Sequence, residues 1–393
     1  MTSSPATLSP RSDGKDRRHG ASCLGATLLV AAGLACVFAQ AAFARPQQAT
    51  PELPALNDGP YIFNDQGKLE AAWVCEGEVA REAVTRHQLI SPRCGYPYPL
   101  MVPAPALTDV AMPYHGERII AVSDIHGQFG LLVRLLRANG VIDDQGRWRA
   151  GNAHLVIAGD VFDRGPQVTE SVWLLLQLQA QARAAGGDVH YLLGNHETMV
   201  LYGDTRYVNP KYVEIAKRLK RSVNGLYGRD TVIGEWLYLR PVLLRLGDTV
   251  FMHGGISPEN LELALDIDDT NATYRSSLGK SRDDVRANPV TARLFDGKRS
   301  PIWYRGYFDG QLETEDVLAL TNRLGVARIV VGHTTLNHIS SLHGGRVIAI
   351  DNGIKRGESG ELLFIEDGKL SRGLLDGSRV PLREFPGAPP RED

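Results

Sequence analysis

A short, mainly apolar segment recurs six times along this chain, and each copy is followed by glycine or a polar residue. The segments occupy residues 119–122, 154–158, 189–193, 249–252, 327–331 and 346–350. Continuous aliphatic and β-branched runs without alternation indicate strands that are buried on both faces. Stretches with helical spacing of apolar residues lie between them, for example at 129–139 and 172–183. This alternation predicts an α/β architecture with right-handed crossovers.

Five of these segments end in residues that can bind a metal ion, and ligands of open α/β sheets bind at the carboxyl ends of strands. The residues are Asp124, His126, Asp160, Asn195, His253 and His333. Six oxygen and nitrogen ligands without a thiolate suit two divalent ions such as Mn, Fe or Zn, of which we favour Mn. We expect Asp160 to bridge the two ions and a hydroxide held between them to attack phosphorus in line. The alternative is that each residue is an unrelated polar group at a strand end.

Five motifs that contain these residues resemble the signature of calcineurin-like metallophosphoesterases of the phosphoprotein phosphatase type. They are Ser123–Gly127, Gly159–Gly165, Gly194–Glu197, His253–Gly255 and Gly332–Thr334. The resemblance extends from about Arg118 to Gly353 and implies a two-sheet β-sandwich flanked by helices. It also implies a set of ligands for each ion. One ion is then held by Asp124, His126 and Asp160, and the other by Asp160, Asn195, His253 and His333.

The same resemblance assigns catalytic roles to four further residues. His196 is expected to protonate the departing oxygen, with Asp163 orienting its imidazole. Arg164 is expected to bind phosphate oxygens, and Arg305 is the candidate for a second phosphate-binding arginine. The alternatives are a structural Asp163–Arg164 ion pair and a surface or stacking role for Arg305. The segments 301–307 and 203–208, with the export signal described below, resemble the bacterial Shewanella-like phosphatases.

The predicted function is that of an exported dinuclear-metal phosphatase acting on phosphomonoesters. We expect its partner to be a phosphorylated protein or peptide, dephosphorylated at Tyr or at Ser/Thr, with the insertions 203–238 and 256–302 framing the substrate. Hydrolysis of dinucleoside polyphosphates or small phosphoesters remains an alternative, as does a catalytically dead phosphoprotein-binding module. A net charge of −2 gives no basic excess for nucleic acid. Four tyrosines in or next to the first insertion either line a cleft or simply pack, namely Tyr202, Tyr207, Tyr212 and Tyr227.

The N-terminal segment has the three parts of a secretory signal. Basic residues at 11–18 precede an apolar run at 23–39 and a small-residue site that ends at Ala44. We expect cleavage after Ala44, export to the periplasm or the outside, and no stable membrane association afterwards. The alternative is an uncleaved membrane anchor, because the run approaches the length that spans a bilayer.

The remaining chain divides into three predicted parts. Residues 45–117 form a linker and a small N-terminal extension, 118–375 the catalytic domain, and 376–393 a C-terminal tail. The extension holds Cys75 and Cys94, the cysteines left after cleavage. Two cysteines in an exported chain predict one disulfide, with two buried thiols as the alternative. The oligomeric state is not predicted.

Overall fold

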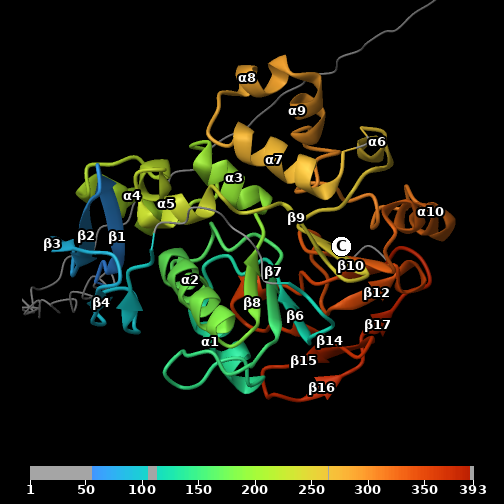
Figure 1. The fold of residues 1–393 in the computed structure, drawn as a ribbon, viewed down its shortest axis with the longest axis horizontal. Coiled ribbons are helices and arrows are strands. Elements are labelled where there is room, and N and C mark those ends of the chain that lie inside the picture. The colour runs from blue at the N-terminus through green and yellow to red at the C-terminus, as the bar shows by residue number, and fades with distance from the viewer. Residues whose placement is uncertain (1–54, 105–112, 264, 390–393) are drawn as a thin grey trace, which may run out of the picture. The chain divides into compact units, whose positions relative to one another are not determined.

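The apolar segments form six of the strands in two six-stranded sheets of the computed structural model, which describes residues 55–104, 113–263 and 265–389 (Figure 1). The predicted signal segment and its cleavage site lie outside the described residues. The first sheet has the order β16-β15-β14-β6-β7-β8. Its strands are β6 (Ile119–Val122), β7 (His154–Ile157), β8 (Asp188–Tyr191), β14 (Leu362–Glu366), β15 (Lys369–Gly373) and β16 (Arg379–Val380).

The second sheet has the order β17-β12-β13-β11-β10-β9. Its strands are β9 (Leu243–Leu246), β10 (Thr249–Met252), β11 (Arg328–Val331), β12 (Ser340–Leu342), β13 (Val347–Ala349) and β17 (Arg383–Glu384). The strands that end in predicted site residues run parallel to one another, β6 with β7 and β7 with β8 in one sheet and β10 with β11 in the other. Their carboxyl ends therefore lie at one edge of each sheet.

The inner faces of the two sheets share one buried apolar cluster. Ala121 and Val156 of the first sheet belong to it together with Phe251, Val330 and Ile348 of the second. The outer faces are covered by helices: α1 (Phe129–Ala138) and α2 (Val168–Ala184) lie on the first sheet, and α10 (Thr314–Leu324) lies beside the second (Figure 1). The predicted two-sheet sandwich with flanking helices is confirmed.

The two insertions form short helices. The first contains α4 (Pro210–Arg218), α5 (Val232–Leu237) and a 3-10 turn at Asn224–Tyr227, and α3 (Asn195–Leu201) precedes it. The second contains α6 (Pro258–Leu261), α7 (Ile267–Ser277), α8 (Arg282–Ala287) and α9 (Pro289–Leu294). Two further 3-10 turns lie at His343–Gly345 and Ile354–Arg356. No helix of the described residues is long and apolar enough to cross a membrane.

The N-terminal extension is an antiparallel sheet in the order β1-β2-β3. Its strands are β1 (Asp58–Asp65), β2 (Lys68–Cys75) and β3 (Glu78–Val84), followed by the pair β4 (Leu89–Ile90) and β5 (Leu100–Met101). β1 packs on α2 and α5, and the indole nitrogen of Trp173 in α2 donates a hydrogen bond to the carbonyl of Pro60 at 2.8 Å. The extension is thus attached to the helical layer that covers the first sheet.

Part of the segment predicted as a C-terminal tail adds an edge strand to each sheet. β16 pairs with β15 and β17 pairs with β12. Both strands are two residues long, so their sequence carries too little periodicity to predict them.

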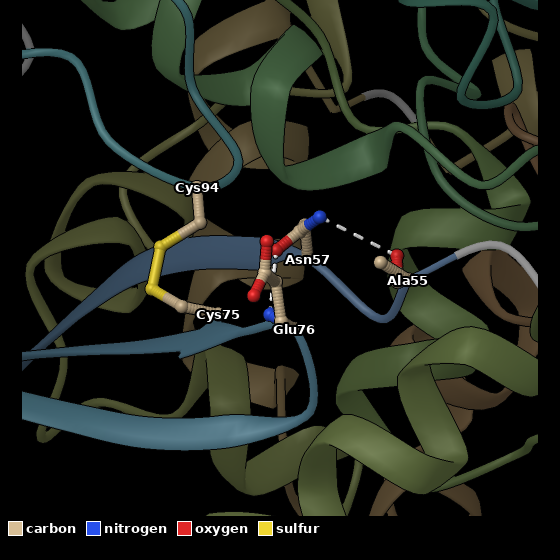
Figure 2. Close-up of a disulfide and its surroundings, with 5 residues drawn as sticks. All are labelled: Ala55, Asn57, Cys75, Glu76 and Cys94. Carbon is tan, nitrogen blue, oxygen red and sulfur yellow. Dashed lines mark hydrogen bonds between the residues drawn. A yellow bond between two sulfur atoms is a disulfide. The ribbon is translucent and has the colours of Figure 1, made fainter.

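Cys75 at the end of β2 is joined to Cys94 by the predicted disulfide, with their Cα atoms 5.2 Å apart (Figure 2). Beside it, the backbone N–H of Glu76 donates to the side-chain oxygen of Asn57 at 2.8 Å (Figure 2). The bridge therefore ties the turn after β2 to the loop that follows β4.

Removing this bridge is expected to destabilise the protein. It spans 19 residues, and closing a loop of that size restricts the unfolded chain by roughly 3 kcal/mol. The free energy of unfolding of the Cys75→Ser/Cys94→Ser variant should fall by about that amount in urea titrations. Reduced wild-type protein is the control and should unfold at the same urea concentration as the variant. Equal stability of oxidised and reduced wild type would contradict the prediction.

Candidate metal centre

The predicted ligands meet where the parallel strands of the two sheets end, and Asp160 lies at their centre. Its Oδ2 is 3.0 Å from Nε2 of His253 and 3.7 Å from Nε2 of His126. Among the described residues, two groups of three have ligand atoms within 4.8 Å of one another. They are His126–Asp160–His196 and Asp160–His253–His333. Asp160 belongs to both groups, as a bridging carboxylate must.

The other two predicted ligands join these groups. Oδ1 of Asp124 is 3.9 Å from Nε2 of His126, and its Oδ2 accepts a hydrogen bond from the backbone N–H of His333 at 3.0 Å. Oδ1 of Asn195 is 2.9 Å from Nε2 of His253. All six side chains, drawn from five strand ends, thus lie in one cluster.

The imidazoles are oriented as metal ligands usually are, with one nitrogen bonded to the protein and the other directed at the site. Nδ1 of His126 lies 2.7 Å from the carbonyl of Phe162, and Nδ1 of His253 lies 2.8 Å from that of Ala158. Nε2 of His333 is buried without a hydrogen-bond partner among the described residues. A buried nitrogen is seldom left unpaired, and a cation at this position would satisfy it.

The charges of the cluster also fit a bound cation. Burial lowers the pKa of His126 to about 3 and that of His333 well below its ordinary value, so both rings are neutral with a free lone pair. Burial alone would lower the pKa of His253, but Asp160 and Asp124 reverse this and raise it to about 9. Burial likewise raises the pKa of Asp124. Neutral imidazoles beside buried carboxylates are ligands that suit a divalent cation.

His196 stands between Asp163 and the ligand cluster. Its Nδ1 is 2.6 Å from Oδ2 of Asp163, and its Nε2 is 3.9 Å from Oδ2 of Asp160. Nη2 of Arg164, an exposed residue, is 3.5 Å from the same Nε2. The geometry is that of an imidazole held by a carboxylate on one side and open to a bound phosphate on the other.

Arg305 lies beside the predicted ligand His333. Its Nη1 donates to the carbonyl of His333 at 2.7 Å and to Oγ1 of Thr334 at 2.9 Å. Burial lowers the pKa of the guanidinium, and the nearby carboxylates of Asp124 and Asp351 oppose this. Arg305 therefore faces the site, where it can bind a phosphate together with Arg164.

The family of the chain follows from comparison with known proteins. The sequence model of the calcineurin-like phosphoesterases matches residues 117–336, more than half of the chain. The chain belongs to this family. Its members use divalent metal ions and hydrolyse phosphoric esters, so the predictions of family and of a phosphatase-type hydrolase are confirmed.

Three relatives are informative. A cold-active protein-tyrosine phosphatase of a Shewanella species is 39% identical, with a TM-score of 0.79 over 83% of this chain and 99% of that one. An uncharacterised protein of Schizosaccharomyces pombe is 35% identical over 62% of this chain and 75% of its own length. Shewanella-like protein phosphatase 2 of Arabidopsis thaliana is 28% identical over 61% and 72%, respectively. The predicted resemblance to Shewanella-like phosphatases is confirmed.

The backbone of this calcineurin-like phosphoesterase is strained at the site. Twelve non-glycine residues among those described have positive φ, and half of them are predicted site residues. These six are Asp124 (54°), His126 (46°), Asp160 (58°), Asp163 (69°), Arg164 (64°) and His333 (64°). Such conformations cost about 1 kcal/mol or more each and persist only where the surroundings impose them.

Glu197 supplies much of that restraint and was given no role from the sequence. Its carboxylate is fully buried and accepts hydrogen bonds from the backbone N–H groups of Asp160, Val161 and Gly194 at 2.7–2.9 Å. It also accepts one from the hydroxyl of Tyr191 at 2.9 Å. The sequence carried a partial signal for this, because an acidic residue three positions after a helix N-cap can accept a hydrogen bond from the N-cap N–H, as Glu197 does from Gly194.

Tyr207 is a second residue whose position sequence reasoning left open. Its side chain is 44% exposed, although its ring lies 5.2 Å from that of His196 and 5.3 Å from the guanidinium of Arg164. Tyr212 and Tyr227 are buried in the core, so the packing interpretation holds for them. Tyr207 instead presents an aromatic surface to solvent beside His196 and Arg164.

Gly194 is needed for the close approach of Asp160. A Cβ at this position would overlap Oδ1 of Asp160 and lie 2.6 Å from its backbone nitrogen. We therefore expect Gly194→Ala to displace the bridging carboxylate and to reduce both metal content and activity by about 10- to 100-fold. Gly130→Ala, at a helical site with open space around it, is the matched control and should change neither. Full metal content and activity in Gly194→Ala would contradict this account.

Proposed function

We propose that this chain is an exported dinuclear-metal phosphatase that removes phosphate from tyrosine side chains of proteins. The observation that carries the proposal is the position of Asp160, shared by two groups of ligand atoms and adjacent to the His196–Asp163 pair. A site that merely binds phosphoproteins needs no such imidazole beside its metal ligands.

Each group of the site has its own role in the proposed hydrolysis. Two divalent ions, of which we favour Mn, would lower the pKa of the attacking water and neutralise charge on the phosphate. Arg164 and Arg305 hold the phosphate oxygens. His196 delivers a proton from Nε2 to the departing oxygen, while Asp163 fixes the ring through Nδ1 and stabilises its cationic form.

The preference for phosphotyrosine rests on Tyr207. A phosphate bound between Arg164 and His196 places the group that carries it next to the Tyr207 ring, and aromatic pairs are worth about 0.5–1.5 kcal/mol beyond burial. An aliphatic serine or threonine side chain gains less there. The protein-tyrosine phosphatase activity named for the Shewanella relative agrees with this choice.

A comparison of matched substrates tests both the activity and the preference. The purified protein with added Mn²⁺ should hydrolyse a phosphotyrosine peptide faster than the phosphoserine peptide of the same sequence. Tyr207→Leu should lower kcat/KM on the phosphotyrosine peptide by roughly 3- to 10-fold and affect the phosphoserine peptide less. Tyr207→Phe retains the ring and is expected to retain the preference. Faster hydrolysis of diadenosine tetraphosphate than of either peptide would contradict the proposal.

Export is supported by two features. The signal-like composition of residues 1–44 is one, and the disulfide between Cys75 and Cys94, a bond typical of oxidising compartments, is the other. N-terminal sequencing of the exported protein should begin at Arg45. Retention of the protein in the cytoplasm would contradict this part of the proposal.

A further inference from the structure

A cavity of about 650 Å³ opens next to the candidate metal centre, between α3 and the helices of the second insertion. Figure 1 shows α7, α8 and α9 (orange) grouped on the side of α3. Met199 and Trp303 form part of its wall. Sδ of Met199 lies 3.9 Å from Nδ2 of Asn195, and the rings of Trp303 and His333 are 5.5 Å apart. The cavity thus adjoins two of the predicted ligands.

The cavity is lined by more positively than negatively charged side chains. Its two carboxylates form ion pairs. Asp204 is 2.7 Å from Arg206, and Asp296 is 2.8 Å from Arg299. Arg282 and Arg286 also line the cavity. Among the described residues, neither guanidinium has an ion pair or hydrogen bond with another side chain, although the charge of Arg282 helps the Arg206 contact to lower the pKa of Asp204. The residues that line the cavity thus include three guanidinium groups, those of Arg206, Arg282 and Arg286, against the two carboxylates of Asp204 and Asp296, an excess of one positive charge.

Arg282 and Arg286 lie four residues apart in α8, and both side chains are exposed. Residues at this spacing lie on the same face of a helix. Both guanidinium groups can therefore contact an anionic ligand that enters the cavity.

The apolar wall indicates what kind of anion this is. Met199, Phe295 and Trp303 lie with the arginines around one space, and no arginine of the cavity contacts a predicted metal ligand among the described residues. A polyphosphate chain running from the metal centre would have to pass along this apolar surface. A peptide suits it better, because its apolar atoms pack on the wall while an acidic side chain reaches the arginines.

We propose that this cavity binds the residues next to the phosphorylated side chain of the substrate, and that Arg282 and Arg286 select acidic residues there. The inference rests on the proposed phosphoprotein phosphatase function and deepens it. It makes the second insertion, which carries α7, α8 and α9, the part of the chain that reads substrate sequence.

Paired peptides test the inference. Both carry the same phosphotyrosine, and the flanking positions are Glu in one peptide and Gln in the other. At low ionic strength the wild-type protein should show a kcat/KM about 3- to 10-fold higher on the Glu peptide, and high salt should reduce the ratio. The ratio should fall to about one in Arg282→Gln/Arg286→Gln. In Arg282→Glu/Arg286→Glu it should invert in favour of a peptide with Lys flanks.

A charge-matched control separates the cavity from the net charge of the protein. Lys68→Gln/Lys369→Gln removes two exposed cations outside the cavity, and its Glu/Gln ratio should equal that of the wild type. An unchanged ratio in the Arg282/Arg286 double variant, or a ratio near one in the wild type, would overturn the inference. A larger loss on diadenosine tetraphosphate than on the Glu peptide would overturn it as well, in favour of a polyphosphate ligand.

Failure of the proposed function gives a different result. Peptides with a non-hydrolysable phosphonate in place of the phosphate report binding alone, measured by fluorescence anisotropy. A preference for Glu flanks in binding without turnover of any phosphopeptide would refute the function and leave the cavity assignment standing. Turnover without a preference in either assay would refute the cavity assignment alone.

Discussion

Asp160→Asn is expected to leave the protein folded but unable to hold two metal ions. The substitution removes the negative charge that lies within 3.0 Å of His253 and 3.7 Å of His126, and an amide cannot bridge two cations. Loss of metal-based charge stabilisation is worth several kcal/mol, so kcat/KM should fall by about 10³-fold or more. Elemental analysis should find fewer than two ions per chain.

Thermal unfolding provides a second measurement on the same variant. A ligand that binds only the folded state raises its stability, so added Mn²⁺ should raise the Tm of the wild type and raise that of Asp160→Asn much less. Asp144→Asn, at an exposed position outside the cluster, should behave like the wild type. Two ions per chain and an undiminished Mn²⁺ response in Asp160→Asn would show that this carboxylate is no bridge.

His196→Asn is expected to separate proton transfer from metal binding. His196 is held by Asp163 at 2.6 Å, and general acid catalysis contributes about 10²- to 10⁴-fold. We expect kcat to fall by that order while the metal content stays at the wild-type value. The loss should be larger on phenyl phosphate than on p-nitrophenyl phosphate, because the more acidic nitrophenol departs with less need for a proton.

Asp163→Asn supplies the matched comparison. The amide still reaches Nδ1 of His196 but no longer stabilises the protonated ring, so its effect on kcat should be smaller than that of His196→Asn, with the same dependence on leaving group. Equal losses on the two substrates, or loss of metal together with activity, would exclude His196 as the acid and make it a structural neighbour of the ligands.

Much of the fold could be predicted because the strands are buried on both faces. A continuous apolar run has few alternatives in a chain of this kind, and the predicted segment 119–122 coincides with β6 (Ile119–Val122). The predicted ligands could be found for a related reason, since residues that follow parallel strands meet at one sheet edge. Sequence periodicity does not show which strands pair, so the division into two sheets came from the resemblance.

The rest depends on contacts that local patterns do not encode. The helices α6, α8 and α9 have only four to six residues, too few for an apolar stripe, although Ser257, Ser281 and Asn288 cap their first turns. Tyr207 is exposed beside His196, whereas Tyr212 is buried. Both are tyrosines between a basic residue and a valine in the sequence, so only their tertiary contacts decide which of them is exposed. The position of Glu197 three residues after an N-cap could have indicated a capping role, but not that its carboxylate holds the loop of Asp160.

The cluster draws its members from both sheets, and this gives a bound cation a mechanical role. Asp124 follows β6 of the first sheet and His333 follows β11 of the second, 209 residues further along the chain. Metal bound here would cross-link the two sheets. The chain loop that it closes is far longer than the one that Cys75 and Cys94 close. When a chelator removes the metal, the edge of the sandwich where the parallel strands end would then be the first part to lose its structure.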